Sequence, residues 1–348
     1  MGFITRDYGL THNGDKVSQF ILTNTNGFEM RVIELGGIIT HLFVPDQYGI
    51  PNDVVLGHDT LKDYEVSPFF MGALIGRYGN RIANGRFELN GKTYQLEQNS
   101  GTNCLHSGSS GFHARIWKGR ELNSDRGVGL ELSYHSPDGE GGFPGNLDVT
   151  VTYLLSQNNA LEIEYRAQCD ADSVLNPTQH SYFNLGGVKT EILDHELTIF
   201  ADEFLAVDTD AIPLAKAEKV DETPFDFRTT KPIGKDIETR HKQLKLGRGY
   251  DHTYVLLQIG GSLVKAARVH HPKSGRSMEV FTTEPGIQFY TSNFLENNPP
   301  AKKGQTHRHQ MGFCLETQHY PNSPNRPDFP TTVLKAGEEF FSKTVYQF

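Results

Sequence analysis

Apolar and polar residues alternate along much of the chain, the pattern of strands that bury one face and expose the other. The alternation is clearest in Leu147–Tyr153 and Leu161–Arg166, and the polar run Ser156–Asn159 between them predicts a hairpin loop. Asn90-Gly91 predicts a second hairpin within 85–96, because this dipeptide accommodates the two positive φ angles of a tight turn. The same pattern predicts further strands at 29–35, 37–44, 129–135, 195–200, 263–270 and 276–282.

Helical signals are few. We expect one short helical turn from Leu61 to Tyr64, with Asp59 as its cap, and no long segment repeats with a period of 3.6 residues. The sequence therefore predicts an all-β fold, a large antiparallel β-sandwich with few short helices. Because no Pro/Ser-rich linker, repeat or low-complexity tract divides the chain, we expect residues 1–348 to form a single domain.

Composition and charge narrow the class of protein. The chain is 36% hydrophobic and 22% charged, as in a globular protein with a core, and its net charge of −9 comes without a Lys/Arg cluster. We therefore expect neither a nucleic acid nor a membrane as partner. Three cysteines without a Cys-x-x-Cys pair favour a reducing compartment, and Arg6 and Asp7 interrupt any signal-peptide core, so we expect the cytoplasm.

His180 lies in an extended segment, 176–185, in which alternate side chains share a face. His180, Tyr182 and Asn184 fall on that face, and an aromatic ring flanked by hydrogen-bonding groups suits a sugar. On this segment alone, a half-buried strand whose histidine bonds a backbone group is the favoured alternative. His180 alone therefore does not decide the function.

Glu316 directly follows the apolar pair Cys314-Leu315. Burial of a carboxylate beside such a pair raises its proton affinity toward that of a useful general base. The alternative is a strand that points Leu315 inward and Glu316 toward solvent.

Three further polar residues are candidates for substrate binding. Arg81 offers a fork of donors, Asp251 offers acceptors, and His106 precedes a Gly/Ser-rich run, 107–111, that suits the rim of a pocket. Each has an ordinary structural alternative: a salt bridge, an Asx-turn and a surface loop, respectively. The sequence contains no Walker loop, dinucleotide fingerprint or nucleophile elbow, which argues against phosphate cofactors and acyl-enzyme chemistry.

The sequence gives only weak evidence for a metal site. The i,i+3 spacing of Glu316 and His319 suits a helix and not a strand, and His307 and His309 lie in a polar, loop-like stretch. Residues 136–145 resemble a calcium loop only superficially, because their ligands lack the EF-hand spacing. We expect no metal and a plain connecting loop at 136–145.

Six segments of the chain, taken in order, form a distinctive set. They are Gly-Arg-Tyr-Gly-Asn-Arg-Ile-Ala-Asn-Gly (76–85), Asn-Cys-Leu-His (103–106), His-Ser-Tyr-Phe-Asn-Leu (180–185), Gly-Tyr-Asp-His (249–252), Thr-Thr-Glu-Pro-Gly-Ile-Gln-Phe-Tyr-Thr (282–291) and Phe-Cys-Leu-Glu-Thr-Gln-His (313–319). Together they resemble the galactose mutarotase (aldose 1-epimerase) family from end to end. The resemblance implies a β-supersandwich, a sugar pocket on a concave sheet face, no cofactor, and interconversion of the α and β anomers of free aldoses such as galactose and glucose.

The resemblance also implies roles for single residues. Glu316 matches the family's general base and His180 its general acid. The substrate-binding residues are expected to be Asn80, Arg81, His106, Asp251 and Gln288, together with the aromatic Tyr182. Two positions depart from the family pattern: Ser107 stands where Gly is usual, and Gln179 stands where Asn is more familiar.

This chemistry needs an acid and a base on one sugar carbon. We expect Glu316 to be ionised and only partly desolvated, His180 to be protonated, and activity to extend across a broad neutral range. Two rival functions remain at this point: a hexose-6-phosphate epimerase of the same fold, which needs extra cationic groups, and a non-catalytic sugar-binding module. We expect a monomer or homodimer whose partner is a small sugar.

Overall fold

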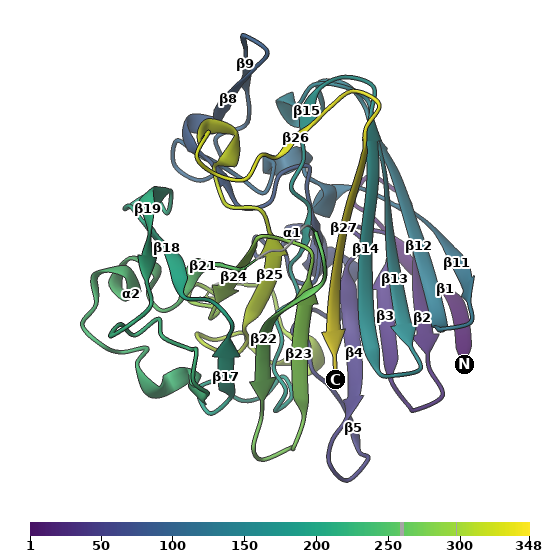
Figure 1. Ribbon diagram of the computed structural model, residues 1–348. Coiled ribbons are helices and arrows are strands. Elements are labelled where there is room, and N and C mark those ends of the chain that lie inside the picture. The colour runs from purple at the N-terminus through teal and green to yellow at the C-terminus, as the bar shows by residue number, and fades with distance from the viewer. Residues whose placement is uncertain (258–260, 297) are drawn as a thin grey trace.

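Antiparallel strands dominate the computed structural model, which describes residues 1–257, 261–296 and 298–348. Figure 1 shows the strands gathered into large sheets that pack on one another. The first sheet contains, in spatial order, β1 (Gly2–Leu10), β2 (Lys16–Thr23), β3 (Glu29–Ile33), β4 (Ile39–Pro45) and β5 (Pro51–Asp53).

The second sheet has nine strands and packs against the first. Its order is β11 (Lys118–Ser124), β12 (Gly127–Ser136), β13 (Leu147–Ser156), β14 (Ala160–Cys169), β27 (Glu339–Gln347), β23 (Ser277–Thr282), β22 (Val264–His270), β17 (Glu196–Ile199) and β20 (Lys231–Pro232).

The third sheet carries much of the site described below. Its order is β19 (Pro213–Lys219), β18 (Glu203–Val207), β21 (Asp251–Val255), β24 (Gly286–Tyr290) and β25 (Cys314–Gln318). Short pairs complete the described strands: β6 (Leu74–Ile75) with β16 (Thr178–Gln179), β7 (Arg81–Ile82) with β10 (Cys104–Leu105), β8 (Arg86–Leu89) with β9 (Lys92–Gln95), and β15 (Ser173–Val174) with β26 (Val333–Leu334).

The alternating segments form strands as predicted, and the all-β sandwich is confirmed. β13 and β14 pair antiparallel around a turn at 157–159, and β8 and β9 pair around Asn90 and Gly91, whose φ angles are 53° and 73°. This second hairpin projects from the top of the molecule in Figure 1. The inward side chains of the sheets meet in one hydrophobic cluster, to which the first sheet contributes Val32 and the second Val151 and Ile163, each at most 1% exposed.

The helices differ in detail from the prediction. α1 (Leu61–Val66) forms where a helical turn was expected, but its cap is Thr60, whose Oγ1 accepts a hydrogen bond from the Asp63 N–H at 3.2 Å. The carboxylate of Asp59 instead accepts from the backbone N–H of Lys303, at 2.6 Å. The sequence did not predict α2 (Lys242–Gly247), because six residues are too few to show a helical period.

The loop at 136–145 is held by an arginine. The buried Arg77 guanidinium donates to the carbonyls of Ser136, Pro137 and Pro144, at 2.8–2.9 Å. A side-chain cation thus already satisfies the carbonyl oxygens that a calcium ion would use, and the loop serves as a connection. Among the described residues, no helix has the length and hydropathy that a membrane span requires.

Candidate active site

A cavity of about 190 Å³ is lined in part by side chains from three strands of the third sheet, β21, β24 and β25. It is smaller than the roughly 300–1,000 Å³ of pockets for drug-sized ligands, which suits one small polar molecule. All eight residues that were expected to be catalytic or substrate-binding line it. The lining residues are Pro68, Phe69, Phe70, Asn80, Arg81, Leu105, His106, His180, Tyr182, Asp251, Gln288, Tyr290, Phe294 and Glu316.

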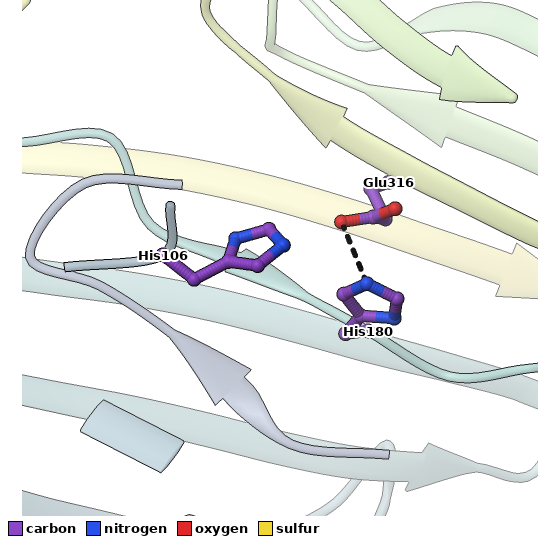
Figure 2. Close-up of side chains that lie close together, drawn as sticks. All are labelled: His106, His180 and Glu316. Carbon is purple, nitrogen blue, oxygen red and sulfur yellow. Dashed lines mark ion pairs between the residues drawn. The ribbon is translucent and has the colours of Figure 1, made fainter. Parts of the chain in front are cut away.

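Glu316 and His180 point toward each other (Figure 2), and both line this cavity. β25 delivers Glu316 next to Gln288 on β24, and the segment that follows β16 delivers His180. The carboxylate Oε2 lies 3.7 Å from His180 Nε2, and this oxygen is buried with no hydrogen-bond partner. Both side chains are at most 6% exposed. The site therefore holds an acid–base pair whose reactive atoms remain available to a ligand.

Burial shifts the pKa values of Glu316 and His180 in opposite directions. Desolvation, reinforced by the charge of Asp251, raises the pKa of Glu316 well above its ordinary value. Desolvation lowers the pKa of His180 to about 4. Glu316 is thus more deeply desolvated than the sequence analysis expected, because β25 is buried along its whole length. These two directions favour a proton on Glu316 and a neutral His180 in the free site, the reverse of the ionised Glu316 and protonated His180 that the sequence led us to expect.

His106 is fixed by Asn80. The backbone N–H of Asn80 donates to His106 Nδ1 at 3.1 Å, so the neutral imidazole carries its proton on Nε2. Burial lowers the pKa of His106 well below its ordinary value, which keeps the ring neutral. His106 can therefore donate one hydrogen bond from Nε2 to a ligand oxygen.

The same bond bears on metal binding. The nitrogen and oxygen ligand atoms of His106, His180 and Glu316 all lie within 4.8 Å of one another, close enough to surround an ion. However, the lone pair of His106 Nδ1 already accepts from Asn80, and Nε2 holds a proton in place of a free lone pair. This donor set fits a hydroxyl-bearing ligand better than a metal ion.

A second His/Asp group lies outside the cavity. His195 Nδ1 is 3.4 Å and His271 Nε2 is 3.7 Å from Asp194 Oδ1. His195 Nε2 accepts the N–H of Leu185 at 3.0 Å, which places the proton of the neutral ring on Nδ1, facing Asp194. His195 thus directs a ring N–H toward the carboxylate and presents no free lone pair to a metal ion on that side.

Asp251, Gln288 and Arg81 form the polar floor. Asp251 Oδ1 accepts from Gln288 Nε2 at 2.6 Å, and the Oε1 atom of Gln288 accepts from the hydroxyl of Thr253. Burial raises the pKa of Asp251, whereas the nearby charge of Arg81 opposes that rise. Arg81 Nε is buried without a hydrogen-bond partner. The floor thus offers an acceptor and an unused donor side by side.

Tyr182 lines the cavity with its ring. Its hydroxyl donates to the carbonyl of Phe69 at 2.9 Å, and its ring stacks on His180 with centroids 5.0 Å apart. Asn184, which the sequence placed on the same face, does not join them: its side chain is 0% exposed and donates to the carbonyls of Thr190 and Met311. A turn begins at Leu185, and the Asn184 side chain bonds this turn instead of the cavity, with its Oδ1 accepting the Gly186 N–H at 3.0 Å.

The cavity also has an aromatic wall that the sequence did not predict. Phe69, Phe70, Tyr290 and Phe294 line it, and the Phe70 ring lies 4.8 Å from that of His106. Phe69 and Phe70 lie in a short irregular loop after α1, where no periodicity marks a function. The pair of adjacent aromatics after Pro68 is the one signal that could have drawn attention to them.

The two departures from the family pattern point away from the cavity. Ser107 Oγ accepts the Tyr78 N–H at 2.8 Å and donates to the Tyr78 carbonyl at 3.2 Å. Gln179 donates to the carbonyl of Gly72 and accepts from the N–H of Ser181, both at 2.8 Å. Both side chains support the backbone that carries the site.

Comparisons with known proteins agree with this geometry. The family model described as Aldose 1-epimerase matches residues 18–347. Galactose mutarotase from Sus scrofa is 45% identical over 91% of this chain and 90% of its own length, and aldose 1-epimerase from Escherichia coli (strain K12) is 38% identical over 97% of both chains. The solved structure of an aldose epimerase homologue from C. elegans, 29% identical, superposes with a TM-score of 0.86 over 99% of this chain and 98% of that one. The chain therefore belongs to the aldose 1-epimerase family.

Proposed function

We propose that this chain interconverts the α and β anomers of free aldohexoses such as galactose and glucose, with Glu316 as general base and His180 as general acid. The observation that carries the proposal is the pair itself. A carboxylate oxygen without a partner and an imidazole nitrogen face each other at 3.7 Å inside a cavity lined by sugar-compatible polar and aromatic groups.

The working form of the pair has its proton on His180, and in the forward direction the ionised Glu316 Oε2 removes the proton from the anomeric hydroxyl. The C1–O1 bond becomes a carbonyl as the C1–O5 bond breaks, and the departing ring oxygen takes the proton of His180 Nε2. The open aldehyde rotates about C1–C2 and closes on its other face, with both protons returning by the reverse transfers. Positioned acid–base catalysis contributes roughly 10²–10⁴-fold, and orientation adds to it.

The other polar groups hold the sugar. His106 donates from Nε2, Asp251 accepts, and the unused Nε of Arg81 donates. Asn80 and Gln288 add amide groups, and the ring of Tyr182 covers an apolar patch of the pyranose. Alternating donors and acceptors suit a ring of hydroxyl groups, each of which both donates and accepts.

The charge of the cavity favours an unphosphorylated substrate. Among the described lining residues the only cationic side chain is Arg81, which stands against the acidic groups of Asp251 and Glu316. A hexose-6-phosphate epimerase needs more positive charge than this to hold its phosphate.

Polarimetry tests the proposal directly. Freshly dissolved α-galactose, α-glucose and glucose-6-phosphate are mixed with the protein, and the optical rotation is followed against the uncatalysed change. Acceleration with the two free sugars, and little with the phosphate, supports the proposal. Binding without acceleration identifies a sugar-binding module and overturns it, and preference for the phosphate identifies the rival epimerase.

Three broader proposals accompany this one. Residues 1–348 form one domain, which is supported by a hydrophobic cluster that runs from Phe20 to Tyr346. The protein works in the cytoplasm in hexose metabolism, in keeping with three buried cysteines that form no disulfide. It acts as a monomer or homodimer without nucleic acid or membrane partners, in keeping with its net charge of −9.

A further inference from the structure

A thiol lies behind the candidate acid. Cys314 Sγ is 3.6 Å from His180 Nδ1, within hydrogen-bond range for sulfur, while Nε2 of the same ring faces Glu316. Cys314 is 0% exposed and His180 is 5% exposed, so their contact is shielded from solvent. The two nitrogens of His180 therefore have different partners: the thiol on one side, and the base and cavity on the other.

One strand supplies both partners. Cys314 and Glu316 are two residues apart on β25, so their side chains leave the same face of the strand. Cys314 reaches Nδ1 and Glu316 reaches Nε2 of the imidazole that lies between them. The register of a single strand thus sets the position of the base and of the group behind the acid together.

The direction of the Cys314 hydrogen bond decides what His180 can do. If the thiol donates to Nδ1, the proton of the neutral ring is on Nε2, and its transfer to the sugar leaves an imidazolate, a very poor product. If Nδ1–H donates to sulfur, Nε2 can take up and release a proton while the ring alternates between neutral and cationic forms. Only the second arrangement supports a reversible proton transfer near neutral pH.

We infer that Cys314 is a positioning residue: its sulfur accepts the Nδ1–H of His180 and so keeps Nε2 as the atom that exchanges a proton with the ring oxygen of the sugar. Sulfur is a weak, uncharged acceptor. A carboxylate in the same place would strongly stabilise the imidazolium. The thiol sulfur orients the ring without that effect, so the imidazolium of His180 can still release its Nε2 proton. The inference rests on the proposed function and adds the residue that sets the acid's tautomer.

Burial keeps the thiol in the form this role requires. Desolvation, with the charges of Glu316 and Asp251, raises the pKa of Cys314 well above its ordinary value, so the group stays an uncharged thiol. A thiolate at this place would instead bind the imidazolium as an ion pair and retain its proton.

Kinetics of two variants test the inference. Cys314→Ser supplies a hydroxyl that can still accept from Nδ1–H, and we expect kcat close to that of the wild type, with the limb of the pH profile that reports His180 displaced to higher pH. Cys314→Ala removes the acceptor, and we expect kcat to fall by about 10-fold or more with KM little changed. The matched control is Cys169→Ala, another buried thiol, 1% exposed and outside the cavity, for which kcat should not change.

A spectroscopic measurement keeps the test independent of activity. Nitrogen-15 NMR of histidine-labelled wild-type protein, with His180 assigned through a His180→Asn variant, should show a protonated Nδ1 in the neutral ring. A deprotonated Nδ1, or wild-type kcat in Cys314→Ala with the control intact, overturns the inference. A wild-type protein that fails to accelerate mutarotation overturns the proposed function instead, while the NMR result still decides the tautomer.

Discussion

Asn80 and His106 hold each other through two reciprocal hydrogen bonds. The Asn80 N–H donates to His106 Nδ1 at 3.1 Å, and the His106 N–H donates to the Asn80 carbonyl at 3.0 Å. Both residues adopt the left-handed backbone region, with φ of 59° and 52°. Left-handed residues other than glycine are uncommon and persist where their surroundings hold them. We call this pair of hydrogen bonds the Asn80–His106 clamp. It holds the His106 ring where it lines the cavity.

Asn80→Ala should lower both stability and sugar affinity. Asparagine tolerates the left-handed region, whereas alanine is disfavoured there by roughly 1–2 kcal/mol, and the Oδ1 atom that accepts from the Arg81 N–H is lost. Urea unfolding should show the stability loss, and KM should rise. The control is Asn84→Ala, an exposed left-handed residue with φ of 56°, which should lose stability and keep its KM. Equal KM values in the two variants would show that the Asn80–His106 clamp does not contribute to sugar binding.

Glu316→Gln should bind sugar and turn over almost none. The amide has nearly the shape of the carboxylate but cannot accept the anomeric proton, so we expect a loss of roughly 10²–10⁴-fold in kcat. Polarimetry measures the rate, and calorimetric titration with galactose measures binding. Glu284→Gln alters another buried carboxylate, 3% exposed, that does not line the cavity, and should remain active. Full turnover by Glu316→Gln would remove this residue from the mechanism.

The pH profile of kcat/KM should be bell-shaped with a low acid limb. Because the pKa of His180 is lowered to about 4, a second proton enters the pair, and removes the base, only near and below pH 4. Because the pKa of Glu316 is raised well above its ordinary value, the limb that reports loss of its proton should lie at higher pH than for a solvent-exposed glutamate. Polarimetry from pH 3 to 10 checks this, and an acid limb centred near pH 6.5 would contradict it.

His319 should add stability that fades in alkali. Burial lowers its pKa, but the charge of Glu284 and a 2.6 Å hydrogen bond to it raise the pKa above the ordinary 6.5 overall. A raised folded-state pKa stabilises fully below the unfolded value and is lost as pH rises through the folded value. The stability difference between wild type and His319→Gln, from urea unfolding, should therefore be larger at pH 6 than at pH 9. An unchanged difference would show that the pair contributes no charge-dependent stability.

Ser107→Ala should destabilise the fold without changing the chemistry. The Ser107 hydroxyl bonds both backbone groups of Tyr78, and its loss leaves a buried N–H unpaired, which costs roughly 1–3 kcal/mol. Its side chain lies outside the cavity, so kcat should stay near that of the wild type. Ser107→Gly, which relaxes the left-handed backbone at φ 66°, should lose less stability than the alanine variant. The reverse order in urea midpoints would contradict this account.

Strands were predicted well from the sequence where one face of the strand is exposed to solvent. β13 and β14 alternate between buried and more exposed positions, and both were recognised. β24 and β25 are buried at every position, so neither strand has the exposed face that marks an alternating strand, although they carry Gln288 and Glu316. Gln288 and Glu316 were identified through the family resemblance, because periodicity does not mark a strand that is covered on both faces.

Much of the site geometry could not be inferred from the chain alone. The Asn80–His106 clamp joins residues 26 positions apart, and the Cys314–His180 contact joins residues 134 apart, so no local pattern reveals either. The resemblance identified residue types and roles, but a tautomer depends on which group lies behind each ring. Only the folded arrangement supplies that information.

The position of β27 has a consequence for synthesis. This strand joins β14 on one side and β23 on the other, and the two halves of the nine-stranded sheet bond to each other through it. A nascent chain that has left the ribosome only as far as residue 338 therefore presents two open, hydrogen-bonding strand edges. Translation must run through 339–347 before this sheet can close, and until then a chaperone that shields strand edges would guard against aggregation.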